Sequence, residues 1–202
     1  MKILAITSKS ATFELDNLSP YFSGNVFLIE LNDKLVRQEN RNVFSVFGLA
    51  PNTDYICKAN GESVKFRTLQ SNIEISVMKF GAVGDGIHDD TGAFTAAMNC
   101  LPENSVLTVP AGNYSIKPVF MKSGITVYLE KGAKVCAAAA RSDYPVLLGV
   151  LEGINCRRNI GTWQGEEADC FASVFTAYEQ NNISIIGEGE IDCGAVQGDW
   201  YF

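Results

Sequence analysis

The sequence has few of the residues that build metal sites and lacks the basic stretches that bind nucleic acid. His88 is its only histidine, and its six cysteines include no Cys-x-x-Cys pair, so a zinc site is not expected. The 202 residues carry a formal net charge of −7. This charge argues against nucleic acid and an anionic membrane surface as partners. We expect no metal and no cofactor.

Long apolar runs are also missing. The first residues, MKILAITSKSATFEL, contain only a short apolar run, whereas a secretory signal needs a longer apolar core and a membrane span needs more still. These residues leave the localisation unknown, with the cytoplasm as the default. The spacing of the cysteines selects no disulfide pairing, and we expect free thiols: Cys57, Cys100, Cys136, Cys156, Cys170 and Cys193.

Short strands and glycine-rich turns predict an all-β fold. Hydrophobic residues make up 47% of the chain, which has 18 glycines, and residues 2–69 alternate in polarity as in a β-sandwich. The stretches LAPNTDY (49–55) and VKFRT (64–68) resemble the end of a fibronectin type III domain, where a tyrosine such as Tyr55 builds the tyrosine corner. The resemblance implies a fibronectin type III-like domain over residues 1–70.

A glycine-rich stretch, VMKFGAVGDGIHDDTGAFTAAMNC (77–100), follows a short linker. Its glycines permit positive φ in a tight loop, and Asp89 or Asp90 is predicted to cap a helix that begins near Thr91. Helical spacing places three apolar residues on one face of that helix: Phe94, Ala97 and Met98.

The aspartates of this stretch have two interpretations. Asp85, Asp89 and Asp90 could form a carboxylate cluster for a metal or for acid catalysis, or they could stabilise the turn and the helix start. We favour the second, and we expect His88 to be an exposed imidazole in the same loop.

Residues 80–91 resemble the N-terminal motif of the pectate-lyase-like right-handed β-helix superfamily, Phe-Gly-Ala-x-Gly-Asp-Gly-x-x-Asp-Asp-Thr. Beyond Cys100, strand and turn segments repeat as in stacked coils. The resemblance implies that residues 71–202 form the incomplete N-terminal part of a right-handed parallel β-helix with an N-terminal capping helix. Inward-pointing residues are predicted to include Val106, Val109, Ile125, Val127, Leu129, Ile183, Ile185 and Ile191.

Within that superfamily, three segments resemble glycoside hydrolase family 28, the polygalacturonases: TWQGEEA (162–168), TAY (176–178) and NISIIGEGEIDCGAVQGDWYF (182–202). Cys193 stands where the family pattern usually has glycine, and Tyr201 stands where it often has a second tryptophan. The resemblance implies inverting hydrolysis of galacturonan in pectin.

The catalytic motifs of that family lie downstream of the segments matched here. In this chain Asn52-Thr53-Asp54 falls in the predicted tyrosine corner, Asp89-Asp90 falls at the predicted helix start, and neither Gly-His-Gly nor Arg-x-Lys occurs. We therefore assign no catalytic residue. We expect the chain to be the N-terminal portion of such a hydrolase, inactive alone, with the catalytic aspartates beyond it.

The sequence offers one candidate contact with a polysaccharide. Trp163, Glu166 and Glu167 could border the sugar groove of the complete enzyme, since an aromatic face can stack on a sugar and carboxylates can accept its hydroxyls. The alternative is a packed loop with Trp163 partly buried. The adjacent Arg157-Arg158 pair could contact an anionic ligand or form a solvated surface, and we favour the latter.

Two other functions compete with this prediction. A non-catalytic carbohydrate-binding or adhesion β-helix module would be expected to end in a cap, whereas QGDWYF offers none. A β-helix lyase would call for calcium-binding aspartates and a basic residue in the coils, and no such cluster is visible. An uncapped coil would also favour self-association of the chain.

Overall fold

The computed structural model describes residues 1–16, 21–153, 156–196 and 198–199. The mostly β architecture that the sequence predicts is confirmed. Among the described residues, no helix is long and apolar enough to span a membrane. The closing QGDWYF segment, on which the expectation of an uncapped end rests, lies largely outside the described residues.

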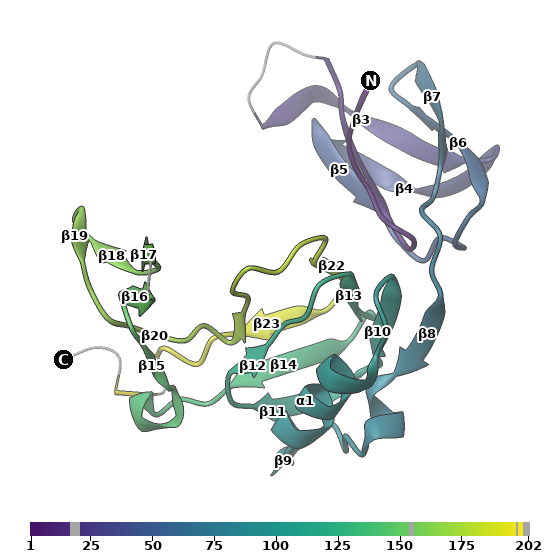
Figure 1. The fold of residues 1–202 in the computed structure, drawn as a ribbon. Helices are drawn as coiled ribbons and strands as arrows, with labels where there is room; N and C mark the ends of the chain where they lie inside the picture. Colours follow the sequence, from purple (N-terminus) through teal and green to yellow (C-terminus); the bar gives the residue numbers. More distant parts are fainter. Residues whose placement is uncertain (17–20, 154–155, 197, 200–202) are drawn as a thin grey trace.

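The first part of the chain forms two antiparallel sheets, at the upper right of Figure 1. One sheet has the order β1-β2-β5 and the other the order β4-β3-β6-β7. The strands are β1 (Lys2–Ile6), β2 (Ala11–Glu14), β3 (Phe22–Leu31), β4 (Lys34–Arg41), β5 (Val43–Val46), β6 (Asp54–Ala59) and β7 (Glu62–Arg67).

Aromatic side chains from both sheets fill the space between them. The Phe13 ring from β2 lies 5.5 Å from that of Phe44 on β5 and 5.3 Å from that of Phe66 on β7. Ile29 and Cys57, from the second sheet, are fully buried in the same cluster. Burial of such side chains is the main driving force for packing two sheets face to face.

The Tyr55 side chain, on β6, is hydrogen-bonded to the backbone of the turn that precedes this strand. The Ala50 N–H donates a hydrogen bond of 2.9 Å to the Tyr55 hydroxyl, as the sequence predicts. The ring stacks on Phe66 at 5.6 Å. Tyr55 is mostly buried and packs against the core of the sandwich, as the tyrosine-corner prediction requires.

The second part of the chain winds as a parallel β-helix. Its first parallel sheet has the order β22-β13-β10-β8, its second has the order β23-β14-β11-β9, and β12 pairs with β21. The first sheet contains β8 (Ile73–Ser76), β10 (Ser105–Val109), β13 (Ile125–Leu129) and β22 (Ser184–Gly187). The second sheet and the pair contain β9 (Asp85–Asp89), β11 (Gly112–Ile116), β14 (Ala133–Ala137), β23 (Glu190–Asp192), β12 (Val119–Phe120) and β21 (Phe175–Thr176).

The interior of these coils is a stack of aliphatic residues from successive strands. Leu107 pairs with Val127 and Val109 with Leu129, and all four are buried in one cluster with Ile125. Ile183 and Ile191 pack against this cluster while partly exposed.

The short helices are η1 (Val77–Phe80) and η2 (Arg141–Asp143).

Two residues predicted to point into the coils behave differently. Val106 is buried but outside the interior cluster, because strand alternation gives the inward positions to its neighbours. It lies on the outer face, in register with Glu74 and Thr126. Ile185 pairs with the inward Val127 yet is 39% exposed, since β22 ends its sheet and no described strand covers it.

The predicted helix is present as α1 (Thr91–Cys100). Its buried residues include Phe94, Ala97 and Met98, which belong to the interior cluster of the coils. The helical spacing read from the sequence is therefore correct for this face.

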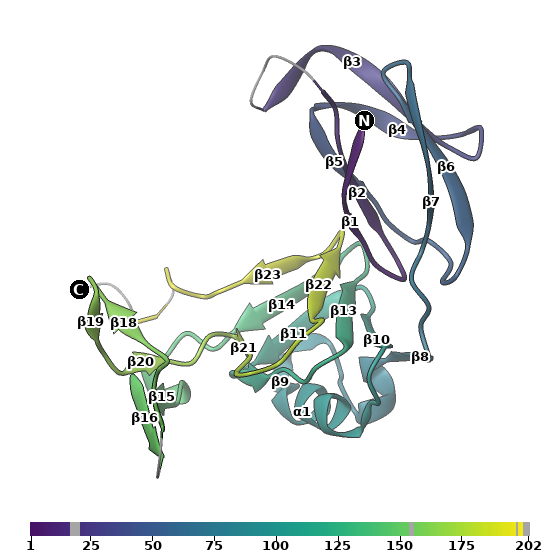
Figure 2. The ribbon, with the colours of Figure 1, turned by 45° about the horizontal axis from the view of Figure 1, so that its top comes forward.

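Polar contacts hold the two sandwich sheets beside the first parallel sheet. The Lys9 ammonium, in the β1–β2 turn, lies 2.9 Å from a Glu74 carboxylate oxygen and 5.6 Å above the Tyr128 ring. After β7, the Leu69 N–H donates to the Thr7 carbonyl at 3.1 Å, which fixes the end of the sandwich beside the same turn. Figure 2 shows this turn beside β13 and β22.

We predict that Tyr55→Phe destabilises the sandwich by about 1 kcal/mol, because the Ala50 N–H loses its acceptor. Amide hydrogen exchange of residues 54–67 reads this region separately from the coils, and protection there should fall about fivefold. Tyr21→Phe, at a tyrosine that is 73% exposed, is the control. Equal protection in the two variants would show that the tyrosine hydroxyl contributes nothing.

Candidate functional site

The aspartate-rich loop before α1 is the first candidate site. Its backbone requires glycine at Gly84, where φ is +69° and an added Cβ would lie 2.8 Å from the ring of Tyr114. The loop leads into β9, which pairs with β11 through Asp85 and Asp89. The side chains of Asp85 and Asp89 therefore lie on the same exposed face of β9.

The capping role predicted for Asp89 or Asp90 falls to Asp89, which accepts from the first N–H of α1, whereas Asp90 holds the loop together. Asp90 is 2% exposed, and its carboxylate accepts hydrogen bonds from the N–H groups of Val83 at 2.7 Å and Gly84 at 3.2 Å. Asp90 occupies the N-cap position of α1 but makes no side-chain cap bond. A buried carboxylate binds the donors that surround it, and here those donors belong to the loop.

The other two carboxylates have separate partners. Asp89 accepts from the N–H of Thr91 at 3.0 Å, and a bond from the Thr91 hydroxyl helps to lower the Asp89 pKa. Asp85 accepts hydrogen bonds from the backbone N–H groups of His88 and Ile87. These bonds, together with a side-chain hydrogen bond to the His88 imidazole, lower the pKa of Asp85 to about 2. His88 Nδ1 lies 2.6 Å from the Asp85 carboxylate.

Each of the three carboxylates is thus bonded within the loop or to the first residue of α1, as the turn-stabilising interpretation expects. Across the described residues, no group of three histidine, cysteine, aspartate or glutamate side chains is placed to hold a metal ion. A general acid needs a raised pKa, whereas the pKa of Asp85 and that of Asp89 are lowered.

The second candidate site is a hairpin arm, residues 146–171, which leaves the coils between β14 and β21. Figure 1 shows it at the left, beside the coils. Three antiparallel pairs build it: β15 with β20, β16 with β17, and β18 with β19. The strands are β15 (Val146–Leu147), β16 (Val150–Gly153), β17 (Cys156–Asn159), β18 (Thr162–Trp163), β19 (Glu166–Glu167) and β20 (Cys170–Phe171).

The arm brings the predicted contact residues together at its outer hairpin. Trp163 pairs with Glu166 across β18 and β19 and is 72% exposed, so the alternative of a packed loop with a partly buried Trp163 is wrong. A two-residue turn at Gln164-Gly165, both with positive φ, fixes this pairing.

The two arginines lie on the same arm, on β17. Arg157 pairs with Glu167 and lies 3.9 Å from Glu152, while Arg158 pairs with Glu179. Most of these side chains are exposed, and surface ion pairs of this kind contribute little to stability. Sequence reasoning did not connect Arg157 with Glu167, because antiparallel hairpins in this insertion were not predicted.

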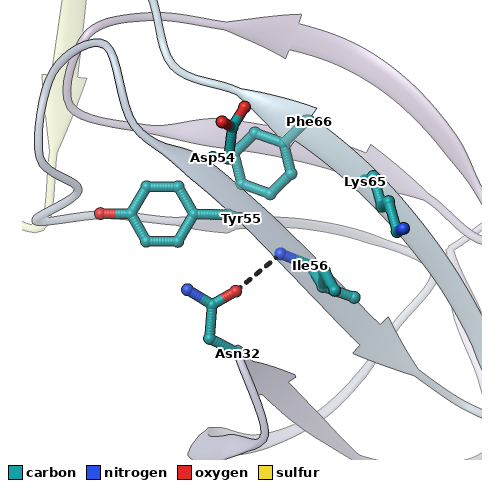
Figure 3. A pocket seen from close by; sticks show the side chains of 6 residues that line it. All are labelled: Asn32, Asp54, Tyr55, Ile56, Lys65 and Phe66. Atoms are coloured by element: carbon teal, nitrogen blue, oxygen red, sulfur yellow. Dashed lines mark hydrogen bonds between the residues drawn. The ribbon is translucent and has the colours of Figure 1, made fainter.

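A third site is a shallow pocket on the second sandwich sheet (Figure 3). Asp54 lies at its rim as the first residue of β6, exposed and 3.3 Å from an Arg67 guanidinium nitrogen. The prediction that Asp54 stands where a turn leads into a strand is correct. The other lining residues are Asn32, Tyr55, Ile56, Lys65 and Phe66.

All six cysteines are free thiols. Cys57 is buried within the sandwich, and this burial raises the pKa of its thiol to about 11. Such a thiol is protonated at neutral pH and is a poor nucleophile.

The parallel coils define a β-helix protein, and comparisons with known proteins narrow this class. Residues 74–143 match the family described as rhamnogalacturonase A/epimerase, pectate lyase-like. An exo-poly-α-D-galacturonosidase from Dickeya chrysanthemi is 28% identical over 126 residues, covering 58% of this chain and 19% of that protein. These matches confirm the resemblance to the pectate-lyase-like superfamily and to glycoside hydrolase family 28.

One solved structure shows the same fold, and a second is more distantly similar. A family 28 exopolygalacturonase from Yersinia enterocolitica has a TM-score of 0.62 at 20% identity, covering 95% of this chain and 40% of that one. A hyperthermoactive exopolygalacturonase from Thermotoga maritima has a TM-score of 0.47 at 28% identity, covering 59% and 24%. The chain spans less than half the length of each of these relatives.

We predict that Asp90→Ala lowers the free energy of unfolding by about 2 kcal/mol, because the N–H groups of Val83 and Gly84 lose their charged acceptor. Thermal and urea unfolding of the coils measure this loss. The control is Asp143→Ala, which removes only a surface pair with Lys117 and should cost less than about 1 kcal/mol. Equal losses in the two variants would contradict the role given to Asp90.

Proposed function

We propose that this chain is the N-terminal portion of a polygalacturonase-like glycoside hydrolase that acts on galacturonan in pectin by inverting hydrolysis. The observation that carries the proposal is the 28% identity to an exo-poly-α-D-galacturonosidase over 126 residues. The match of residues 74–143 to the pectate-lyase-like family supports it. The polysaccharide is the proposed partner of the complete enzyme.

The catalytic aspartates of the proposed enzyme lie outside these 202 residues. Inverting hydrolysis needs a general acid and a general base about 6.5–9.5 Å apart, with the acid's pKa raised. The carboxylates of the aspartate-rich loop are instead bonded to N–H groups of Val83, Gly84 and Thr91 and to His88. Asp54 is paired with Arg67.

We also propose the domain assignment made from the sequence. The strand orders β1-β2-β5 and β4-β3-β6-β7, with the bonded Tyr55 hydroxyl, support a fibronectin type III-like domain over residues 1–70. For residues 71–202, helix α1 is proposed to cap the first coil of a right-handed β-helix. Its apolar face packs into the coil interior, and β8 and β9 are the first strands of their sheets.

In this proposal the hairpin arm contacts the polysaccharide through Trp163, Glu166 and Glu167. The exposed indole of Trp163 is suited to stacking on a sugar ring. Glu166 has no ion pair with any described residue, so its carboxylate is available to accept hydrogen bonds from sugar hydroxyl groups. Glu167 is neutralised by Arg157, which reduces its repulsion of an anionic substrate. The alternative function is a non-catalytic carbohydrate-binding or adhesion module, in which the same arm binds without hydrolysis.

We predict that residues 1–202 release no reducing ends from polygalacturonate, whereas the full-length protein does so with inversion at the anomeric carbon. Reducing-end assays and NMR of the first-formed anomer measure the two outcomes. Asp54, Asp85, Asp89 and Asp90, changed singly to Asn in the full-length protein, should affect stability more than turnover. Turnover by the 202-residue chain that is lost in any of these variants would refute the proposal, and a full-length protein that binds without hydrolysis would establish the alternative.

Trp163→Ala should weaken the binding of trigalacturonate at the arm about tenfold, because an aromatic contact contributes up to about 1.5 kcal/mol. NMR titration of the amides of residues 162–167 follows this site. Phe120→Ala, which removes an exposed aromatic side chain from β12, is the matched control. Equal affinities in the two variants would remove Trp163 from the substrate contact.

A further inference from the structure

A cavity of about 380 Å³ lies where the sandwich meets the first parallel sheet. The β1–β2 turn and the segment after β7 form one side of this junction cavity, and the starts of β10, β13 and β22 form the other. Figure 2 shows how closely these segments approach one another. Cavities of about 300–1,000 Å³ between domains are frequent sites for small molecules.

The coil side of the junction cavity presents amide and hydroxyl side chains from successive coils. Asn104 and Asn182 begin β10 and β22 with left-handed backbones, at φ of 61° and 55°. Between them lies Gly124, where an added Cβ would come within 2.9 Å of the Asn104 backbone nitrogen. Thr126 and Ser184 follow as register partners on the outer face of the sheet. The stacking of the coils thus gathers these short polar side chains at one place.

The polar side chains of the junction cavity have no partners within the protein. Ser8, in the β1–β2 turn, is only 5% exposed, and its hydroxyl makes no hydrogen bond with any described residue. Five more lining side chains also make none with the described residues: Gln70, Asn104, Thr126, Asn182 and Ser184. Because buried polar groups are almost always hydrogen-bonded to protein, water or a ligand, this group needs partners from outside the chain.

The chemistry of the lining favours an uncharged ligand. None of the described residues that line the junction cavity is charged, and the neighbouring Lys9 ammonium is already paired with Glu74 at 2.9 Å. An ionised ligand would lose hydration there without gaining a counter-charge. Amide and hydroxyl groups both donate and accept hydrogen bonds, and Ile6 and Leu69 add apolar surface. A neutral sugar offers the matching hydroxyl groups and C–H surface.

We propose that the junction cavity binds one residue of an uncharged sugar. Ser8 and Gln70 bond to its hydroxyl groups from the sandwich side. Thr126, Ser184 and the two asparagines do so from the coil side, so the sugar bridges the two parts of the chain. The inference goes beyond the proposed hydrolase, because it assigns a neutral ligand to a site separate from the arm.

The test is an NMR titration of the 202-residue chain with four neutral sugars, each alone: D-galactose, D-glucose, D-xylose and L-arabinose. The amides to follow are those of residues 7–8, 69–70, 104–105, 124–126 and 182–184. We expect saturable shifts with at least one sugar, and these should not change with salt, because no charge pair is screened. D-Galacturonate should bind at least fivefold more weakly than the tightest of the four.

Two variants remove single hydroxyl groups from the junction cavity. Ser8→Ala and Thr126→Val should each weaken sugar binding about fivefold, the usual effect of one lost hydrogen bond. Neither should lower the midpoint of thermal unfolding, because neither hydroxyl bonds to a described residue. Ser63→Ala, at an exposed serine of β7, is the control and should leave binding unchanged. A purely structural hydroxyl would give the reverse result, a lower midpoint with unchanged binding.

The junction cavity and the arm can fail independently in these experiments. Trp163→Ala should leave the shifts of the cavity amides, and Ser8→Ala in the full-length protein should leave kcat on polygalacturonate unchanged. The inference is overturned if none of the four sugars shifts the cavity amides, if Ser8→Ala and Ser63→Ala bind equally, or if D-galacturonate binds as well as the tightest neutral sugar.

Discussion

The stacking of apolar residues at one register position in successive coils is the constraint on which the rest of the structure depends. Leu107, Val127 and Ile185 occupy one row across β10, β13 and β22. A parallel strand shifted by one residue would point its apolar side chains out of the coil, so each coil repeats the same inward positions. Differences in length between coils are therefore confined to the segments that connect the strands. The hairpin arm is one such insertion, and the chain rejoins the parallel strands at β21, which pairs with β12.

The outer faces left by this stacking determine where the other parts attach. The outer row Glu74, Val106 and Thr126 lies on the first parallel sheet, and there Glu74 receives Lys9 from the sandwich. Val106 is buried without contributing to the coil interior, which places an apolar contact beside that ion pair. An exposed ion pair contributes little alone, so burial beside it and the contact of Lys9 with the Tyr128 ring add to the attachment.

Local patterns in the sequence predicted the local structure well. The corner around Tyr55, the helix from Thr91 and the glycine-rich loop were each readable, because turns and helix faces depend on residues close in sequence. The role of Asp90 was not readable, since a carboxylate before a helix can bond helix or loop N–H groups, and only tertiary packing decides which. The hairpins that hold Trp163 and the pocket beside Asn32 depend on pairings between distant segments, which alternation of polarity does not specify.

The side chains that hold the aspartate-rich loop differ in character from those proposed to contact the polysaccharide. Asp85 and Asp89 receive donors that lower their pKa, and a carboxylate held in this way stays ionised through the neutral range, where a general acid must hold a proton. Such bonds suit loops that must keep one shape. Trp163 has the opposite character, since its side chain is 72% exposed and a large exposed aromatic face is open to contact with a ligand. This difference is what the proposed polysaccharide contact at Trp163 requires.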